Sequence, residues 1–398
     1  KNTTGYSLNA LTDFSDPVQI IKHLIIGSEG TLAFISGITM NTVAENPFRA
    51  SSLMIFPDIR NACTAVVLLK QGPVTAVELI DRAGLSAVAD KEGMPEFLKT
   101  LSPGASALLV ETSSAGMDDL GRQIEQIMNA IGNIPVEMPV RFTDNPAEYA
   151  VYWNIRKGLF PSVGAMRRPG TTVIIEDVAF PVERLADATA DLQELLRKSG
   201  YNDAVIYGHA LEGNLHFIFS QDFSMKEETE RYRILMEEVA KLVIDKYDGS
   251  LKAEHGTGRN VAPFVEKEWG KEAFMVMHRI KQIFDPKQIL NPGVVLNSDP
   301  EIHLKNLKPL PPAHEIIDKC IECGFCEPSC VSADLTLTPR QRISVFREIS
   351  KLVKSGHEPH MASSLIRAYS YAGDYTCATD GLCAITCPVK IDTGKLIK

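Results

Sequence analysis

The stretch that decides the fold of the C-terminal region reads Cys320-Ile321-Glu322-Cys323-Gly324-Phe325-Cys326-Glu327-Pro328-Ser329-Cys330. A second block reads Cys377-Ala378-Thr379-Asp380-Gly381-Leu382-Cys383-Ala384-Ile385-Thr386-Cys387-Pro388. The first block has the spacing C-x2-C-x2-C-x3-C, and the second repeats it with Asp380 in place of the second cysteine. Proteins that hold two [4Fe–4S] clusters use this spacing, and the fourth cysteine of each block ligates the other cluster. The two blocks therefore predict two iron–sulfur clusters.

The spacing also predicts which side chains share a cluster. One complete cluster is expected on Cys320, Cys323, Cys326 and Cys387. The second is expected on Cys330, Cys377 and Cys383, with Asp380 at or near its fourth iron. Because a carboxylate is a harder ligand than a thiolate, we expect that corner to be labile, and a [3Fe–4S] form is an alternative state. Disulfides and structural zinc are the other interpretations, and both are disfavoured because seven of the eight cysteines fall into the two blocks.

Composition narrows the class of protein. The 398 residues suffice for two or three domains, and a net charge of −9 without a basic block argues against general nucleic-acid binding. No apolar run has the length of a membrane span, and no signal peptide is visible. We expect a cytoplasmic location, with a peripheral position at the inner membrane as the alternative. Because the chain begins with Lys1 and stops soon after Cys387, we also expect a piece of a longer polypeptide.

Apolar periodicity predicts a mixed α+β fold. Between residues 50 and 142 it predicts two βαβ-like units, which favour a ferredoxin-like α+β cap laid over a site. The expected strands are residues 53–56, 107–111 and 172–178, with a strand–turn–strand unit at 204–220. The expected helices are residues 16–24, 59–70, 117–131, 182–199, 226–246, 270–284, 339–354 and 360–372. Cys63 lies in one of these helices among apolar residues, so we expect a buried thiol without chemistry.

Proline content and loss of periodicity mark residues 297–312 as a linker. The expected division is therefore 1–46, 47–296, the linker 297–312, and a mainly α-helical cluster domain at 313–398.

A second chemical feature combines histidines with a glutamate. Residues 208–216 read Gly-His-Ala-Leu-Glu-Gly-Asn-Leu-His, and as a hairpin they would place His209 and His216 opposite each other, about 5 Å apart at Cβ. Glu254 and His255 lie on a glycine-flanked loop. If the chain is extended there, their side chains would point to opposite sides. Two histidines and one carboxylate suit zinc with an open position or non-haem Fe(II). Satisfied structural histidines are the alternative.

A small-residue turn follows the first expected helix. Gly27, Ser28, Glu29, Gly30 and Thr31 separate an apolar helix from an apolar strand. Exposed backbone N–H groups in such a turn can receive a pyrophosphate, although a Gly-Ser-Glu-Gly sequence is more often a simple turn.

Five motifs in this order resemble one family, the FAD-linked D-2-hydroxy-acid dehydrogenases with a vanillyl-alcohol-oxidase type of flavin domain. The motifs are Lys1-Asn2-x-x-Gly5-Tyr6, residues 27–32, Gly208-His209-x-x-x-Gly213-Asn214-x-His216, Glu254-His255-Gly256-x-Gly258 and residues 284–293. The appended cysteine domain is similar to that of the large bacterial fusion type. The resemblance covers nearly the whole chain.

The resemblance implies roles for single residues. Residues 27–32 would lie against the FAD pyrophosphate, and Asn291 and Gly293 would return to the flavin side. His209, His216 and Glu254 match the family's metal ligands, which makes a divalent metal, zinc first, the expected ion. His255 matches the active-site base, and Asn214 and Arg156 match positions that hold substrate polar groups.

Three departures from the family pattern matter. The first half of the flavin domain is absent before Lys1. Ile175 stands where some 2-hydroxyglutarate enzymes have a lysine, and Arg167 or Arg168 could supply that distal charge. Asp380 breaks the four-cysteine pattern.

The resemblance implies oxidation of a D-2-hydroxy acid, D-2-hydroxyglutarate or D-lactate, to the 2-oxo acid. FAD takes two electrons and each cluster carries one, so electrons would pass to an acceptor other than NAD. A quinone, an electron-transfer protein and a further cysteine-rich domain are the candidates, and a homo-oligomer is an open alternative. The rival functions are a 2-His-1-carboxylate hydrolase or oxygenase with structural clusters, and a pure iron–sulfur electron-transfer subunit.

Overall fold

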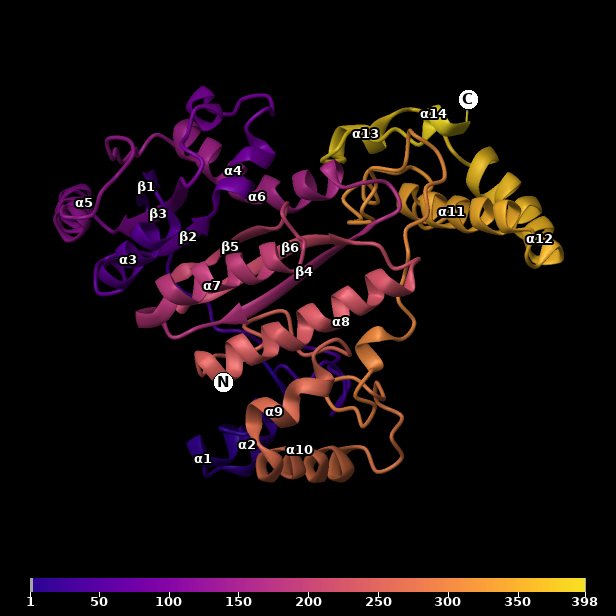
Figure 1. The fold of residues 1–398 in the computed structure, drawn as a ribbon, viewed down its shortest axis with the longest axis horizontal. Helices are drawn as coiled ribbons and strands as arrows, with labels where there is room; N and C mark the ends of the chain where they lie inside the picture. Colours follow the sequence, from indigo (N-terminus) through magenta and orange to yellow (C-terminus); the bar gives the residue numbers. More distant parts are fainter. Residues whose placement is uncertain (1–2, 398) are drawn as a thin grey trace.

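A six-stranded antiparallel sheet lies at the centre of the computed structural model, which describes residues 3–397 (Figure 1). The strand order is β1-β3-β2-β5-β6-β4, and every neighbouring pair is antiparallel. The strands are β1 Phe48–Phe56, β2 Ala76–Ile80, β3 Ser106–Ser114, β4 Thr172–Ala179, β5 Val205–His209 and β6 Asn214–Gln221. Residues 1, 2 and 398 lie outside this description, and with them the start of the first family motif.

The sheet consists of two halves with the same order of elements. In the first half β1 and β2 are joined through a helix and β3 fills the space between them; in the second half β4 and β5 are joined in the same way and β6 lies between them. Pairing of β2 with β5 joins the halves. This split βαβ arrangement is the ferredoxin-like one that the sequence predicts, but its second half lies at residues 172–221 and not before residue 142. The sequence did not reveal β2.

Helices cover both faces of the sheet. One face packs against α3 Ile59–Leu69, α5 Met117–Ile131, α7 Leu185–Lys198 and α8 Lys226–Ala240, and the other against α4 Arg82–Val88 and α6 Pro146–Met166 (Figure 1). Leu79 and Ile80 enter the two opposite cores because successive strand residues point to opposite faces. Cys63 is fully buried in the first core, where burial raises the pKa of its thiol to about 12. That confirms a buried thiol.

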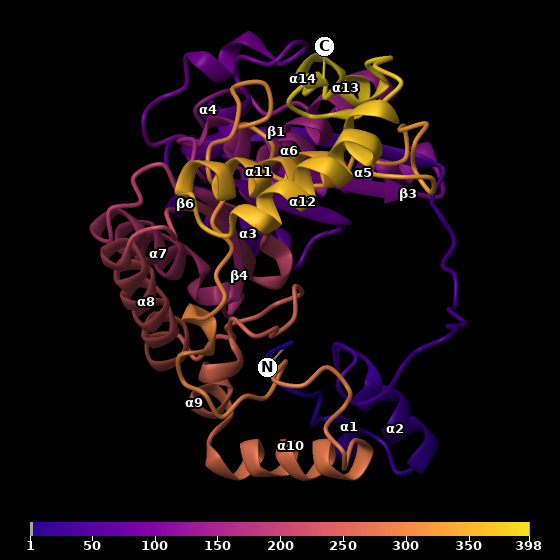
Figure 2. The same cartoon turned by 90° about the vertical axis from the view of Figure 1, so that its right-hand side faces the viewer.

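A lobe below the sheet is formed by two segments that lie far apart in the sequence. It contains α1 Ala10–Asp13, α2 Pro17–Ile25, α9 Val265–Trp269 and α10 Lys271–Phe284 (Figure 2). Its own core includes Tyr6, Leu24 and Met277. The strand expected after the small-residue turn was wrong. Residues 33–47 form an extended trace along one side of the molecule (Figure 2), and no strand within residues 3–397 pairs with them to complete a ladder.

The C-terminal region is mainly helical, as predicted. It contains α11 Pro339–Ser355, α12 Pro359–Tyr369, α13 Leu382–Thr386 and α14 Gly394–Ile397. A capping box of Thr338 and Gln341 begins α11. The buried apolar core of this region is small and consists of Ile317, Ile343 and Ile391. Each helix among residues 3–397 is too short or too polar to traverse a lipid bilayer.

Candidate active site and cluster sites

The structure brings His209, His216 and Glu254 together at one end of the sheet. His209 ends β5, His216 lies in β6, and Glu254 lies on the loop that precedes α9. The Oε1 atom of Glu254 is 3.2 Å from His209 Nε2 and 3.0 Å from His216 Nε2. One ligand atom from each residue falls within 4.8 Å of the other two. Two imidazoles and one carboxylate in this arrangement fit a divalent metal ion.

The hairpin differs from the predicted one in its register. Tyr207, not His209, lies opposite His216, while His209 pairs across the sheet with Glu78 of β2. A short 3₁₀ turn, Ala210–Glu212, separates the two strands and still leaves the two imidazole centroids 5.5 Å apart. The turn closes at Gly213, which has φ +66° and where a Cβ would lie 2.0 Å from the Phe180 carbonyl oxygen. Only glycine fits there.

Asp177 of β4 fixes the loop that carries Glu254 and His255. Its Oδ2 atom accepts hydrogen bonds from three consecutive backbone N–H groups, of Ala253 at 2.9 Å, Glu254 at 2.7 Å and His255 at 3.2 Å. Its Oδ1 atom lies 3.1 Å from the buried ammonium of Lys252. Burial would raise the pKa of Asp177, but Lys252 and the N–H donors hold it below its usual value. The carboxylate therefore stays charged and anchors the loop.

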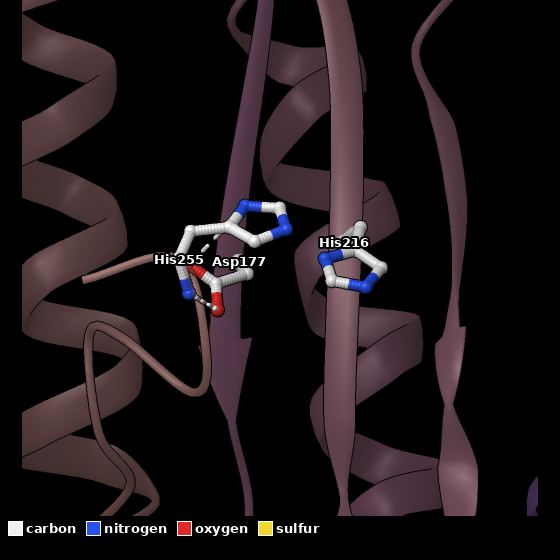
Figure 3. A group of neighbouring side chains, drawn as sticks. All are labelled: Asp177, His216 and His255. Carbon is white, nitrogen blue, oxygen red and sulfur yellow. Dashed lines mark hydrogen bonds and ion pairs between the residues drawn. The ribbon is translucent and has the colours of Figure 1, made fainter. Parts of the chain in front are cut away.

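His255 lies beside the metal-type trio rather than on the opposite side of the chain. Its ring stacks on His216 with centroids 4.7 Å apart (Figure 3). Its Nδ1 is 3.8 Å from Asp177 Oδ1, and its Nε2 is 3.7 Å from Glu254 Oε1. Asp177, His216 and His255 form a second group with metal-ligand spacing. Because the Asp177 oxygens are already engaged, the trio of His209, His216 and Glu254 is the better metal site.

A buried glutamate connects the trio to Arg156. Glu78 is only 4% exposed, and its Oε1 lies 2.5 Å from His209 Nδ1 while its Oε2 accepts from Arg156 Nε at 2.6 Å. Burial would raise the pKa of Glu78, but the hydrogen bond from His209 and the charge of Arg156 hold it below its usual value. The guanidinium of Arg156 lies 4.4 Å over the Tyr207 ring. Sequence reasoning missed Glu78, although a lone acid in the apolar run of residues 76–80 is a signal.

Burial and hydrogen bonding shift the pKa values of His216 and His209 in opposite directions. Burial, reinforced by the neighbouring charges of His255 and Arg156, lowers the pKa of His216 to about 3. The hydrogen bond to Glu78 raises the pKa of His209. His216 is therefore neutral at pH 7 and offers a lone pair to a metal. Asn214 precedes it by two residues on the same strand face; it is buried, and its Oδ1 has no hydrogen-bond partner within the described chain.

The predicted flavin-side motifs also meet. The side-chain amide of Asn291 donates to the Glu29 carbonyl at 2.8 Å. The Glu29 carboxylate accepts from the backbone N–H groups of Thr257 at 2.6 Å and Gly258 at 2.9 Å, immediately after His255. Gly27, Gly30 and Gly293 all have positive φ, and Ser28 and Thr31 are buried. Three segments far apart in sequence thus form one surface beside the histidines.

The four cysteines assigned to the first cluster line one cavity. Cys320, Cys323, Cys326 and Cys387 share this cavity with Pro161 of α6. Burial raises the pKa of the Cys326 thiol to about 12, a cost that iron ligation would offset because ligation binds the thiolate.

The side chains assigned to the second cluster come from the loop that holds Cys330, from the loop that holds Cys377 and Asp380, and from α13, which holds Cys383. Hydrogen bonds tie the two loops together. Thr376, next to Cys377, bonds through its hydroxyl to Thr336 at 2.7 Å and through its carbonyl to Ser332, two residues after Cys330. Asp380 is exposed and accepts from the Leu382 N–H at 3.1 Å.

Comparison with known proteins decides the family. Residues 45–295 match the family model described as FAD linked oxidases, C-terminal domain. The chain belongs to the FAD-linked oxidases. Residues 316–391 of this FAD-linked oxidase match a 4Fe-4S dicluster domain, which supports iron–sulfur clusters beside FAD as cofactors.

Curated relatives of this FAD-linked oxidase carry dehydrogenase names. The D-lactate dehydrogenase [cytochrome], mitochondrial, of Arabidopsis thaliana is 32% identical and covers 69% of this chain and 47% of its own length. The D-2-hydroxyglutarate dehydrogenase of Pantoea ananatis is 26% identical and covers 98% of this chain and 44% of its own length. A solved 4-ethylphenol oxidase from Gulosibacter chungangensis is 18% identical, with a TM-score of 0.47 over 65% of this chain and 55% of that one. The chain spans about half the length of the curated relatives it matches.

The distal charge suggested for Arg167 was wrong. Arg167 is buried, and its guanidinium donates to the carbonyls of Asp318 and Cys320, each at 2.9 Å. The residue therefore joins α6 to the first cluster loop. Arg168 is exposed and pairs with Asp222 at 3.1 Å.

Proposed function

We propose that this chain supplies the substrate half and the electron exit of an FAD-dependent D-2-hydroxy-acid dehydrogenase. The observation that carries the proposal is the convergence of His209, His216 and Glu254 with His255 stacked against them. The names of the curated relatives support a substrate such as D-2-hydroxyglutarate or D-lactate. The dicluster match supports electron transfer away from the flavin.

His209, His216 and Glu254 would hold a divalent metal, for which zinc is the first candidate and Fe(II) the alternative. Such an ion supplies Lewis-acid polarisation of a substrate hydroxyl, and FAD supplies the hydride acceptor. The fit is supported by His216, whose pKa near 3 leaves its imidazole neutral and able to ligate.

His255 would be the general base. Its Nδ1 faces the charged Asp177 carboxylate, which favours a proton on Nδ1 and leaves the Nε2 lone pair toward the trio. Nε2 would take the substrate hydroxyl proton, so no further rearrangement of the ring is needed. Arg156, held by Glu78, and Asn214, with its unpartnered Oδ1, would bind the substrate's polar groups.

The test uses the full-length natural polypeptide, purified without oxygen. D-lactate, glycolate, D-malate and D-2-hydroxyglutarate are mixed with it in turn, and bleaching of the flavin absorption is followed. We expect one D-2-hydroxy acid to bleach the flavin and His255→Ala to slow that reduction by about 10²–10⁴-fold. Unchanged reduction in His255→Ala would remove this residue as the base. A protein without flavin but with a redox-active or hydrolytic metal would instead support the oxygenase or hydrolase alternative.

A further inference from the structure

Arg342 of α11 is the largest fully buried side chain among the described residues, with 1% exposure. Its Nε donates to the Gly373 carbonyl at 2.8 Å, and its Nη1 lies 3.6 Å from the Sγ of Cys330. Its Nη2 has no hydrogen-bond partner within residues 3–397. No carboxylate in that part of the chain lies within ion-pair distance of its guanidinium. The carboxylate of Asp374 acts on Arg342 electrostatically but forms no ion pair with it. A buried, always charged group without an ion-pair partner is costly.

A second buried polar group near Arg342 also lacks a hydrogen-bond partner within the described residues. The buried hydroxyl of Tyr369 on α12 also has no partner within residues 3–397. Burial raises the pKa of Tyr369, and the charges that act on it include those of Arg342 and Cys377. Two buried donors without acceptors therefore lie beside Cys330, which Arg342 contacts, and near Cys377, whose charge acts on Tyr369. Thiolates and sulfides of a cluster are acceptors that this position lacks.

The first cluster cavity has a different electrostatic design. Arg347, four percent exposed, donates to the Cys320 carbonyl at 2.9 Å and pairs with Glu322 at 3.1 Å. Arg340 pairs with Glu327 at 3.1 Å. These arginines have carboxylate partners, so their charges are largely compensated near the first cluster. Among these three arginines of the described chain, Arg342 is the one without a carboxylate at ion-pair distance.

We propose that Arg342 is a positioning residue that raises the reduction potential of the second cluster through its charge and its contact with Cys330. Reduction adds one negative charge to a cluster, and a buried positive charge that no close ion pair neutralises stabilises the reduced form. The charge of Arg342 thereby makes the second cluster a better electron acceptor than its ligands alone would make it. This inference rests on the proposed assignment of Cys330, Cys377 and Cys383 to a second cluster.

The experiment is an anaerobic redox titration of the full-length holoenzyme followed by electron paramagnetic resonance, with iron and sulfide measured on each sample. Arg342→Met removes the charge and keeps most of the volume. We expect it to lower one of the two midpoint potentials by at least a tenfold change in the one-electron equilibrium, which is about 59 mV. The other midpoint should stay unchanged. Lys351→Gln removes an exposed charge from the same helix and should move neither midpoint.

Each result decides the matter. Two loaded clusters with both midpoints unchanged in Arg342→Met would overturn the proposal. If Arg342→Met does not retain the second cluster's iron, Arg342→Lys decides instead. It keeps the charge but loses the fork that reaches both Gly373 and Cys330, so we expect a lowering smaller than about 59 mV, and a lowering as large as that despite the retained charge would overturn the proposal. Iron for only one cluster in the wild type would refute the two-cluster assignment and leave flavin reduction by substrate intact.

Discussion

The two metal-type sites of this chain rest on very different amounts of packing. The histidine–glutamate site lies on a six-stranded sheet with a large core on each face. The cysteine sites lie mostly on loops, and the buried apolar core there is Ile317, Ile343 and Ile391. We therefore infer that packing of the sheet forms the histidine–glutamate site without its metal. The cysteine region, in contrast, depends on its clusters for part of its folded structure.

Polar anchoring follows the same division. Asp177 and Glu78 are buried carboxylates on strands, and each holds a residue of the trio or its loop by short hydrogen bonds. Around the clusters, the buried arginines instead bind backbone carbonyls, such as Arg167 on Asp318 and Arg347 on Ile317. Carbonyls fix where a loop runs but do not fill its interior. The comparison therefore predicts opposite responses to loss of metal.

The largest expected effect is removal of both clusters. Binding energy of structural metal centres is folding energy, so we expect the amides of residues 313–397 to lose most of their protection in hydrogen exchange. Strands β3 and β6 should keep theirs. Cys326→Ser should reproduce part of the loss, whereas Cys63→Ala should keep its iron, because Cys63 is buried in the sheet core. Full protection of α11 without iron would break the comparison.

Asp177→Asn tests whether the sheet site is built by buried charge. The change weakens three hydrogen bonds and the 3.1 Å ion pair with Lys252, so the free energy of unfolding of the sheet should fall by about 2–3 kcal/mol. Urea unfolding followed by Trp fluorescence measures it. Asp187→Asn, which removes an exposed partner of Arg60, is the control and should cost less than about 1 kcal/mol. Equal effects in the two variants would argue against the anchoring role.

Glu78→Gln tests orientation rather than folding. Removing the carboxylate behind a metal-ligating histidine typically lowers metal affinity about 10–100-fold. We expect that loss for zinc, measured by competition with a chromophoric chelator. Glu111→Gln is matched to it, because Glu111 is a buried carboxylate on the neighbouring strand β3 and pairs with Arg49 instead of a histidine. An unchanged zinc affinity in Glu78→Gln would remove Glu78 from the site.

The local motifs could be predicted from the sequence, but the pairings between distant strands could not. Cysteine spacing predicted the four cysteines that line the first cavity, because one short loop carries Cys320, Cys323 and Cys326 and the repeated block supplies Cys387. His209, His216 and Glu254 were predicted from neighbouring motifs. Glu78 was not, because it meets His209 only through the pairing of β2 with β5, 131 residues apart in sequence. The predicted hairpin register was wrong for a related reason. The 3₁₀ turn removes His209 from the ladder between β5 and β6, and no local sequence pattern indicates this turn.

The smallest expected effect lies in the segment that joins the two regions. His303 is 7% exposed and packs against Phe264, with ring centroids 5.4 Å apart. Burial lowers its pKa, although the carboxylates of Glu237, Glu301 and Asp299 act in the opposite direction and Arg233 reinforces the lowering. The unfolded chain therefore binds more protons than the folded one below the ordinary histidine pKa of about 6.5.

Stability from His303 is thus present above about pH 6.5 and is lost as the pH falls. The loss is at most about 1.4 kcal/mol per pH unit for one group. We expect amide protection of residues 302–304 and their neighbours in α8 to decrease between pH 7 and pH 5, with the sheet strands unaffected. His303→Leu should flatten this dependence, because leucine keeps the apolar contact without a titrating nitrogen, while exposed His357→Leu should not. A pH dependence that survives in His303→Leu would assign it to another group and leave the joining segment as a passive spacer.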